Sequence, residues 1–538
     1  MKSTVNKFVY LRSLHGYEMK ALPISTQTFS KLRELDMLYV DKTPLIHQLI
    51  SAKARQYFLA RPRRFGKSMT ISTIKSIYEG EKQYFKDLWI EEKWDWSKTH
   101  PVIHLQFASM AYDGIGLKTA LIDACQTHAK QWNLNLEAQD FVLIFKELIQ
   151  KTAQRYGRVV ILIDEYDKPI IDYLEKEKRS IAEENRSILR QFYSIIKDAD
   201  PYIEFFFMTG VSKFSQTGIF SHLNHLNDIT LDEKYVNLVG YTPTELKDYF
   251  ADWLVHCWQK FPDWTWDTFM DQIRSWYNGF SWDGVNTVYN PYSILNLLDK
   301  RSFEDYWFKT GTPTFLLKLM REQEEFLFND LHLSGRLLAS YDLENLDLRT
   351  ILFQTGYLTI KHIDHQNGIY TLDYPNREVE QSMSDYILAE LLHTSYTSSG
   401  IPVFNIKTAF LKNDQPKVIQ IINAILKDVP SHLIENKRER FYHALVHLHF
   451  RYLGLLMDSE VHTSDGRMDA VVKTATHVYI IEFKLDEKAA VALQQIRDKG
   501  YAEKFGLEKR EVVLVGVGFD SEKKCVGDWG AEKWCLQL

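Results

Sequence analysis

A short basic stretch near the N-terminus has the residue types and the spacing of a loop that binds phosphate. In such loops a lysine contacts the β- and γ-phosphates of a nucleotide, and the hydroxyl of the next residue binds Mg²⁺. Lys67 and Ser68 have these positions, while Arg61 stands where the standard motif has its first glycine. The match is therefore partial, and a solvated surface turn is the alternative. The residues predicted to bind the nucleotide in this loop are Arg63, Arg64, Phe65, Gly66, Lys67, Ser68 and Met69.

The residues on either side of this loop predict the elements that would hold it. Residues 56–60 are largely apolar and strand-like, and residues 69–75 form a plausible helix. A strand, a tight loop and a helix in this order present backbone N–H groups at a helix N-terminus, where an anion is stabilised. We therefore expect a phosphate group at the start of this helix.

A second segment ends in two carboxylates. Residues 159–163 are all Val, Ile or Leu, and Asp164 and Glu165 follow them directly. A continuous apolar run of this length predicts a central parallel strand that is buried on both faces. Acids at the carboxyl end of such a strand hold Mg²⁺ in ATPases, so we expect Asp164 to bind Mg²⁺ and Glu165 to polarise the attacking water. The two acids alone could equally begin a loop, but together with the loop at 61–68 they favour ATP binding.

A third apolar segment, residues 202–208, ends in Thr209 and Gly210. In ATPases of this architecture a polar residue at the end of a neighbouring strand often senses the γ-phosphate. Thr209 is predicted to have this role and to belong to the nucleotide site, with Ser212 as a second candidate. A plain strand end is the alternative interpretation.

A separate pattern of acids and a lysine lies in the C-terminal part of the chain. Asp469 precedes an apolar run, residues 478–481, which is followed by Glu482 and Lys484. Alternation along a strand places Glu482 and Lys484 on one face, with Asp469 across a hairpin. Two carboxylates could then converge on one Mg²⁺, while the lysine orients water or stabilises charge on a phosphoryl group. This spacing is the signature of PD-(D/E)XK nucleases, and an exposed ion pair on a strand is the alternative.

Two helices are expected beside this hairpin. The first, residues 489–505, carries Gln495, Lys499 and then Tyr501, and these side chains could face phosphate or water. Gln495 is accordingly predicted to be a catalytic residue. The second, residues 436–450, contains Glu439 as a possible additional acid, although a surface ion pair is an equal alternative.

The elements that must position these residues fall into four predicted segments. Residues 1–22 are expected to be a loosely attached leader, and residues 23–239 an α/β domain in which the stretch 115–155 is helical. The segment 240–395 begins at Gly240 with a capping-box pattern and later contains a helix, a glycine and a hairpin, which suggests a winged-helix-like unit. The last segment, 396–538, contains the PD-(D/E)XK pattern.

Composition places the chain among ordinary globular proteins. It has 538 residues, is 45% hydrophobic and 25% charged, and has a net charge of −6. That charge gives no bulk attraction to nucleic acid or to an anionic membrane, so a DNA site must be a local basic patch. The four cysteines form no CxxC pair, which disfavours structural zinc and a disulfide framework. We find no signal peptide and no membrane span, and expect a cytoplasmic protein.

Taken together, the chain resembles the bacterial AAA-ATPase-like proteins that carry a C-terminal PD-(D/E)XK nuclease domain. The resemblance extends over residues 23–510, and Arg61 is normal for that family. The matching segments, in chain order, are residues 39–43, 61–68, 163–167, 210–214, 353–358, 466–469 and 482–484.

This resemblance implies a P-loop NTPase domain with a doubly wound parallel sheet, a helical and winged-helix-like middle region, and an α/β domain like that of restriction endonucleases. It also implies ATP and Mg²⁺ as cofactors, an ATPase with Mg²⁺-dependent endonuclease activity on DNA and, by association, a role in defence or in the control of mobile elements. The oligomeric state stays open, a homo-oligomer included.

Two other classes of function compete with a nuclease driven or regulated by ATP. One is a nucleotide-switched binding protein whose nuclease-like domain is inactive, and the other is an NTPase that acts on protein partners in signalling. The presence of Asp469, Glu482 and Lys484 together favours the nuclease, since inactive domains tend to lose one of the three.

Overall fold

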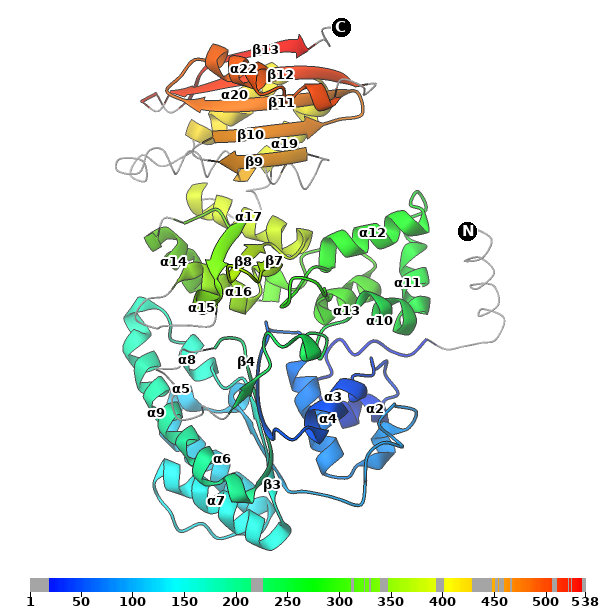
Figure 1. Cartoon of the computed structure of the whole chain (residues 1–538), viewed down its shortest axis with the longest axis vertical. Coiled ribbons are helices and arrows are strands. Elements are labelled where there is room, and N and C mark those ends of the chain that lie inside the picture. The colour runs from blue at the N-terminus through cyan, green and yellow to red at the C-terminus, as the bar shows by residue number, and fades with distance from the viewer. Residues whose placement is uncertain are drawn as a thin grey trace, which may run out of the picture. The chain divides into compact units, whose positions relative to one another are not determined.

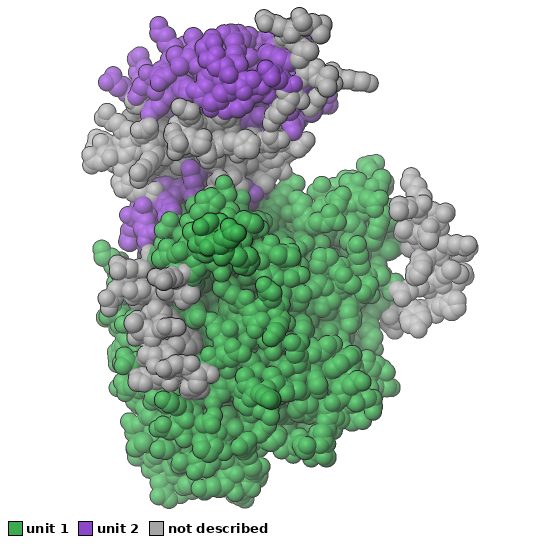
Figure 2. Space-filling model, viewed as in Figure 1, with its two compact units in different colours: residues 1–316, 328–378 green, residues 317–327, 379–538 purple. Residues whose placement is uncertain are grey.

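The computed structural model describes the chain in two compact units (Figure 2). Unit 1 comprises Met1–Leu316 and Phe328–Glu378, and unit 2 comprises Leu317–Leu327 and Val379–Leu538. Within the described part of the chain, none of the helices has both the length and the apolar character needed to cross a membrane. The described residues are 19–213, 226–310, 314–323, 325–328, 330–338, 347–392, 401–427, 448–449, 453, 459–464, 467–505, 510–520, 522–523 and 525–534.

The N-terminal part of unit 1 is built on a parallel sheet with the order β2-β3-β4-β1-β5. All four neighbouring pairs of strands are parallel, and every residue of β3 is buried, as the uninterrupted apolar run predicts. This confirms the predicted doubly wound α/β domain. The strands are β1 Gln56–Ala60, β2 Val102–Gln106, β3 Val159–Asp164, β4 Ile203–Gly210 and β5 Asn227–Asp228.

Helices cover both faces of this sheet (Figure 1), with α2, α3 and α4 on one side and α6, α7 and α9 on the other. The stretch 115–155, predicted to be helical, contains two long helices separated by a break. The first ends where Asn133 takes a left-handed conformation (φ 50°), and the second begins where the Asp140 carboxylate caps two backbone N–H groups. The helices are α2 Phe29–Glu34, α3 Thr43–Ser51, α4 Lys67–Tyr78, α5 Tyr112–Ile115, α6 Leu117–Gln131, α7 Phe141–Tyr156, α8 Lys168–Ile171 and α9 Arg179–Asp198.

Residues 240–378 of unit 1, called the middle region below, combine helices with a small antiparallel sheet of order β6-β8-β7. The predicted capping box is confirmed, since Thr242 and Glu245 each accept the other's backbone N–H at the start of α10. The predicted hairpin is confirmed as β7 and β8. The elements are α10 Pro243–Tyr249, α11 Ala251–Trp258, α12 Trp266–Tyr277, α13 Pro291–Lys300, β6 Leu331–Ser334, α15 Gly335–Leu338, α16 Leu348–Thr355, β7 Thr359–Asp364 and β8 Ile369–Asp373.

A buried carboxyl group joins three segments of the middle region. Glu378 accepts hydrogen bonds from the Ser293 hydroxyl at 2.8 Å and from the Trp307 backbone N–H at 2.6 Å. Burial raises the pKa of Glu378 from its ordinary value of 4.5 to about 8, and the hydrogen bonds oppose only part of this shift. The native protein therefore keeps this proton at pH values where the unfolded chain has released it.

Replacing Glu378 with glutamine is expected to remove a pH dependence of stability. In the wild type the native state binds more protons than the unfolded state between about pH 4.5 and pH 8, so the free energy of unfolding falls as pH rises through this window. Within this window the free energy of unfolding should fall by up to about 1.4 kcal/mol for each unit of pH. Glutamine keeps an acceptor for the Trp307 N–H, and its amide N–H can donate to the Ser293 hydroxyl, which then accepts; the amide does not titrate. Urea unfolding of both proteins from pH 5 to pH 9 measures the difference, and parallel curves would contradict the assignment.

Unit 2 contains a five-stranded mixed sheet with the order β13-β12-β11-β10-β9, in which only the pair β11–β12 is parallel. This agrees with the predicted C-terminal α/β nuclease-like domain. The predicted helix over 489–505 is too long, because the helix ends at Asp498 and Gly500 then takes a positive φ of 63°. The elements are α19 Ile401–Leu411, α20 Gln415–Lys427, β9 Ser459–Ser464, β10 Arg467–Lys473, β11 His477–Leu485, α22 Ala489–Asp498, β12 Glu511–Asp520 and β13 Cys525–Trp534.

Candidate nucleotide and metal sites

The loop after β1 turns sharply into α4. Gly66 precedes the helix with φ 98°, a left-handed conformation that glycine adopts without strain. The first helical hydrogen bond runs from the Thr70 N–H to the Gly66 carbonyl, so the N–H groups of residues 67–69 have no acceptor inside the helix. The start of α4 therefore has the geometry of an anion site.

The Lys67 ammonium lies inside this loop. Its Nζ donates to the backbone carbonyls of Arg61 and Pro62, both at 2.9 Å, and the residue is only 5% exposed. Burial lowers the pKa of Lys67, while the charges of Asp164 and Glu165 act against that shift. A phosphate oxygen would offer this buried cation a full negative charge where it now has two neutral acceptors.

The two predicted acids lie at the carboxyl end of β3. Asp164 is buried and accepts a hydrogen bond from the Thr209 hydroxyl at 2.7 Å. Glu165 is half-buried and has φ 54°, an uncommon value for a residue other than glycine. Burial raises the pKa of the Glu165 carboxyl, and the Lys67 ammonium partly opposes the shift. The Thr209 hydroxyl thus orients Asp164, and its role as a γ-phosphate sensor stays a prediction.

A cavity of about 450 Å³ brings part of the predicted site together, and this volume is typical of small-molecule sites. Lys67, Ser68 and Glu165 line one part of it, as do the other predicted loop residues from Arg63 to Met69. Its remaining wall is largely apolar or aromatic and comes from segments distant in sequence. These residues include Ile24, Leu38, Tyr39, Val40, Leu238, Val239, Tyr241, Tyr292 and Leu295.

The cavity residues fit a nucleoside triphosphate with Mg²⁺. The helix start and Lys67 can receive phosphate oxygens, and the Ser68 hydroxyl with the nearby acids can supply oxygen to the metal. The apolar wall suits the base. The fit rests on Lys67, Ser68 and Glu165, which line the same cavity.

Arg61, which departs from the standard motif, has a structural role. It is 1% exposed, its Nη1 donates to the carbonyls of Ala60 at 2.9 Å and Thr230 at 2.7 Å, and its guanidinium carbon lies 3.9 Å from the centroid of the Trp282 ring. The arginine therefore fixes the loop to the segment that follows β5 and to the middle region. Sequence reasoning assigned it no structural role, because Thr230 and Trp282 are more than 160 positions away along the chain.

The next residues of the loop also contact the middle region. Arg63 donates to the Tyr357 hydroxyl at 3.2 Å, and the guanidinium carbon of Arg64 lies 4.0 Å from the Tyr292 ring centroid. A Cβ on Gly356 would lie 2.6 Å from Pro62. The loop at residues 61–68 is therefore packed directly against the middle region.

The segment that follows β4 is held by two residues that sequence reasoning left without a role. The Asp167 carboxylate accepts from the backbone N–H groups of Val211 at 2.9 Å and Ser212 at 2.6 Å, and from the Ser212 hydroxyl at 2.8 Å. The Tyr166 hydroxyl donates to the Ser212 carbonyl at 3.0 Å. In the sequence, the only indication of this role was that Tyr166 and a third acid, Asp167, directly follow Asp164 and Glu165.

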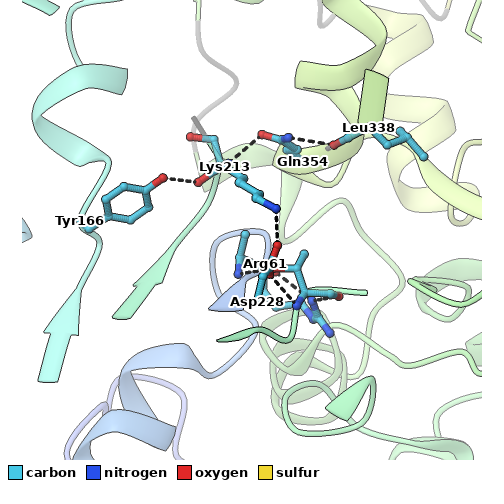
Figure 3. Close-up of polar contacts among 9 residues, drawn as sticks. Arg61, Tyr166, Lys213, Asp228, Leu338 and Gln354 are labelled. Carbon is cyan, nitrogen blue, oxygen red and sulfur yellow. Dashed lines mark hydrogen bonds and ion pairs between the residues drawn. The ribbon is translucent and has the colours of Figure 1, made fainter. Parts of the chain in front are cut away.

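Lys213 extends this connection to the middle region (Figure 3). Its backbone N–H donates to the Gln354 side chain on α16 at 3.0 Å, and the Gln354 amide donates to the Leu338 carbonyl at 3.3 Å. The Lys213 ammonium forms an ion pair with Asp228 at 2.5 Å. The end of β4, next to Asp164, is thus connected to α16.

Three of the predicted catalytic residues of unit 2, Glu482, Lys484 and Gln495, lie together where α22 covers β11. Glu482 is fully buried, and its carboxylate lies 3.3 Å from the Lys484 ammonium. That ammonium donates to the Gln495 side chain on α22 at 2.5 Å. The strand register pairs Asp469 on β10 directly with Glu482 on β11. Glu439 lies outside the described residues.

This arrangement fits a magnesium ion held by few protein ligands. Mg²⁺ keeps several of its waters and is commonly bound by one or two carboxylates. Glu482 is one such carboxylate, and the backbone register places Asp469 opposite it on β10. Among the described residues there is no group of three or more His, Cys, Asp or Glu side chains that could hold a metal ion. A richer ligand set, as for zinc, is therefore not part of the described site.

Comparison with known proteins agrees with the two predicted domains. Residues 23–220 match a family described as a predicted AAA-ATPase, and residues 437–529 match the PD-(D/E)XK nuclease superfamily. A relative from Azotobacter chroococcum mcd 1, described as an uncharacterized protein in the vnfD 5′ region, is 37% identical over 520 residues. The matched part covers 94% of this chain and 98% of the relative, so the likeness extends over nearly the whole of both.

Proposed function

Because the chain belongs to the family of predicted AAA-ATPases with a C-terminal domain of the PD-(D/E)XK nuclease superfamily, we propose that it binds and hydrolyses ATP and thereby controls a metal-dependent nuclease that acts on DNA. The observation that carries the proposal is the cavity where Lys67, Ser68 and Glu165 meet at the carboxyl edge of a parallel sheet. A setting in defence or mobile-element control rests on the family resemblance.

In the ATPase, each residue has a distinct proposed task. Lys67 and the start of α4 bind the phosphates, and Ser68 and Asp164 hold Mg²⁺, which neutralises charge on the transferred phosphoryl group. Glu165 orients the attacking water and accepts its proton. The raised pKa of Glu165 supports this task, since a base works best when its pKa lies closer to the working pH.

In the nuclease, Asp469 and Glu482 are proposed to hold Mg²⁺, which acts as a Lewis acid on the phosphodiester when bound. Lys484 stabilises negative charge that develops on the phosphate and orients water. We propose that Gln495 positions Lys484, because its side chain accepts a hydrogen bond from the ammonium. The Glu482 carboxylate also helps to position Lys484, because it forms an ion pair with the same ammonium group.

Incubation of the purified chain with plasmid, linear and single-stranded DNA tests the proposal. Each substrate is offered with and without ATP, and with Mg²⁺, Mn²⁺ or a chelator. We expect cleavage of DNA that requires the divalent ion and changes with ATP. If no DNA or RNA is cleaved under any of these conditions, the alternative, a nucleotide-switched binding or signalling protein with an inactive nuclease-like domain, takes its place.

ATP is expected to change cleavage through the middle region, because Gln354 on α16 contacts the segment next to Asp164 and Thr209. A ligand shifts a conformational equilibrium only through its different affinities for the two states. The Glu165→Gln variant should bind ATP and hydrolyse it slowly, which holds the protein in one state. The Lys67→Ala variant should hold it in the other. Cleavage rates of both variants and the wild type at saturating ATP should therefore differ.

A third variant localises this coupling. Gln354→Ala removes the acceptor for the Lys213 N–H and should leave ATP binding in place while weakening the effect of ATP on cleavage. Gln259→Ala, the same change at an exposed position after α11, is the matched control. Equal cleavage rates in the wild type, Glu165→Gln and Lys67→Ala would mean that the two activities are only tethered, and coupling would be abandoned.

A further inference from the structure

A second cavity of about 410 Å³ lies in the middle region and shares no lining residue with the nucleotide cavity. It is formed by the segments that connect α11 to α12 and follow α13, by α12 itself, and by Arg377. None of its lining residues, all in the described part of the chain, is acidic. Four of them are aromatic, three are basic, and two are neutral and polar.

The aromatic residues form a platform at the cavity in which one pair of rings is stacked and the other rings pack beside it. The rings of Phe261 and Trp264 are nearly parallel, with centroids 4.7 Å apart and an interplanar angle of 13°. Phe303 meets both rings at 5.5 and 5.7 Å, and Trp276 lies 5.9 Å from Phe303. All four are half-buried rather than enclosed. A planar aromatic ligand could extend this stack.

The basic residues surround the platform with positive charge. The Arg377 guanidinium lies 4.6 Å from the Trp276 ring centroid. Lys260 is exposed, and Arg301 follows the last residue of α13 in a left-handed conformation, with φ 52°. Because the whole chain carries a net charge of −6, attraction of an anion to this surface must come from such a local group of cations.

A ligand that suits this cavity must combine a flat aromatic part with negative charge. A nucleobase with its phosphate has both properties, and proteins that hold single strands combine aromatic stacking platforms with basic side chains in this way. In a duplex the bases are stacked inside and cannot reach such a platform. The chemistry therefore favours a single strand over a duplex.

We propose that this cavity binds a base and the adjoining phosphate of a single-stranded nucleic acid. The inference rests on the proposed nuclease function, because the cavity would hold a strand of the nucleic acid on which the nuclease acts. The inference concerns binding of the strand and not its cleavage. A free mononucleotide offers the same base and phosphate, so the test must separate the two sources. A strand engages more than one phosphate and should gain affinity with length.

Fluorescence anisotropy with labelled oligo(dT) in a chelator and without ATP tests the proposal apart from cleavage. We expect oligo(dT) to bind more tightly than duplex DNA of equal length and more tightly than dTMP. Trp264→Ala should weaken binding about tenfold, as expected for loss of one stacking platform. The double variant Lys260→Gln with Arg301→Asn should weaken it similarly and reduce its salt dependence. Asparagine tolerates the left-handed conformation at 301, so this variant should fold normally.

Arg274→Gln removes one positive charge from α12 outside the cavity and should bind oligo(dT) like the wild type. Photocrosslinking of oligonucleotides that contain 5-bromouracil should label a peptide containing residue 261, 264, 276 or 303.

Normal oligonucleotide binding by both cavity variants would overturn the inference and leave the nuclease proposal intact. Absence of binding by the wild type, equal affinity for a duplex, or equal affinity for dTMP would each overturn it as well. If the wild type binds oligo(dT) as expected but cleaves no nucleic acid, only the proposed nuclease function is contradicted and the binding inference stands.

Discussion

The Lys67→Ala variant is expected to lose measurable ATP binding, a decrease in affinity of at least about a hundredfold, or roughly 2.7 kcal/mol. The ammonium lies inside the loop, where it donates hydrogen bonds to the carbonyls of Arg61 and Pro62. Alanine leaves the helix start with its N–H groups but removes the full charge that would meet the β- and γ-phosphates. A charged hydrogen bond in a buried site is among the stronger polar interactions.

Isothermal titration with a non-hydrolysable ATP analogue measures this effect. Lys75→Ala is the matched control, because it makes the same change on α4 at a residue paired with Glu79 and outside the cavity. Thermal unfolding of both variants is needed as well, since alanine at 67 also leaves two loop carbonyls without their donor. A folded Lys67→Ala variant with wild-type affinity would overturn the assignment of this loop to phosphate binding.

The sequence alone predicted the elements whose signal is local. The apolar run before Asp164 led directly to a buried parallel strand, and the glycine before Lys67 led to a turn into a helix. Alternation along residues 477–485 placed Glu482 and Lys484 on one face, and they do form an ion pair. Periodicity and turn chemistry act over a few residues, so they can be read without knowledge of the fold.

The contacts that join the loop at 61–68 and the end of β4 to the middle region could not be predicted from local sequence patterns. Gln354 meets the Lys213 backbone across 141 positions, and Arg63 meets Tyr357 across 294. These pairs depend on how the middle region packs on the phosphate-binding loop, and no local pattern encodes that packing. The same reason explains why Arg61 looked like a defect in the motif, although its guanidinium is used to hold the loop.

The ends of helices could not be predicted from hydrophobic spacing either, for a different reason. The stretch 115–155 has helical spacing of apolar residues throughout, yet Asp140 starts a new helix within it by capping backbone N–H groups. In α22 the pattern likewise continued past the point where Gly500 turns the chain. Hydrophobic spacing predicts which face of a helix is buried, while its ends are decided by individual capping residues.

The second large effect is expected in unit 2, where Glu482→Gln and Lys484→Ala should each lower DNA cleavage by about a hundredfold or more. Glutamine preserves the volume of the buried carboxylate but removes a metal ligand's charge. Alanine at 484 removes the cation that lies between Glu482 and Gln495. Asp469→Ala should have a similar effect, because its register position faces Glu482. ATPase activity should remain nearly intact in all three variants.

Plasmid cleavage with Mg²⁺ and phosphate release from ATP, measured on the same preparations, test this separation. Glu511→Gln and Lys533→Ala are matched controls, since they form an ion pair at 2.9 Å on the same sheet, well exposed on β12 and β13. Both controls should cleave like the wild type. Gln495→Ala, which removes only the partner that positions Lys484, should lower cleavage less than Lys484→Ala does. Wild-type cleavage by a folded Glu482→Gln variant would show that the metal is held elsewhere, because a site built on one or two carboxylates cannot lose one without losing its ion.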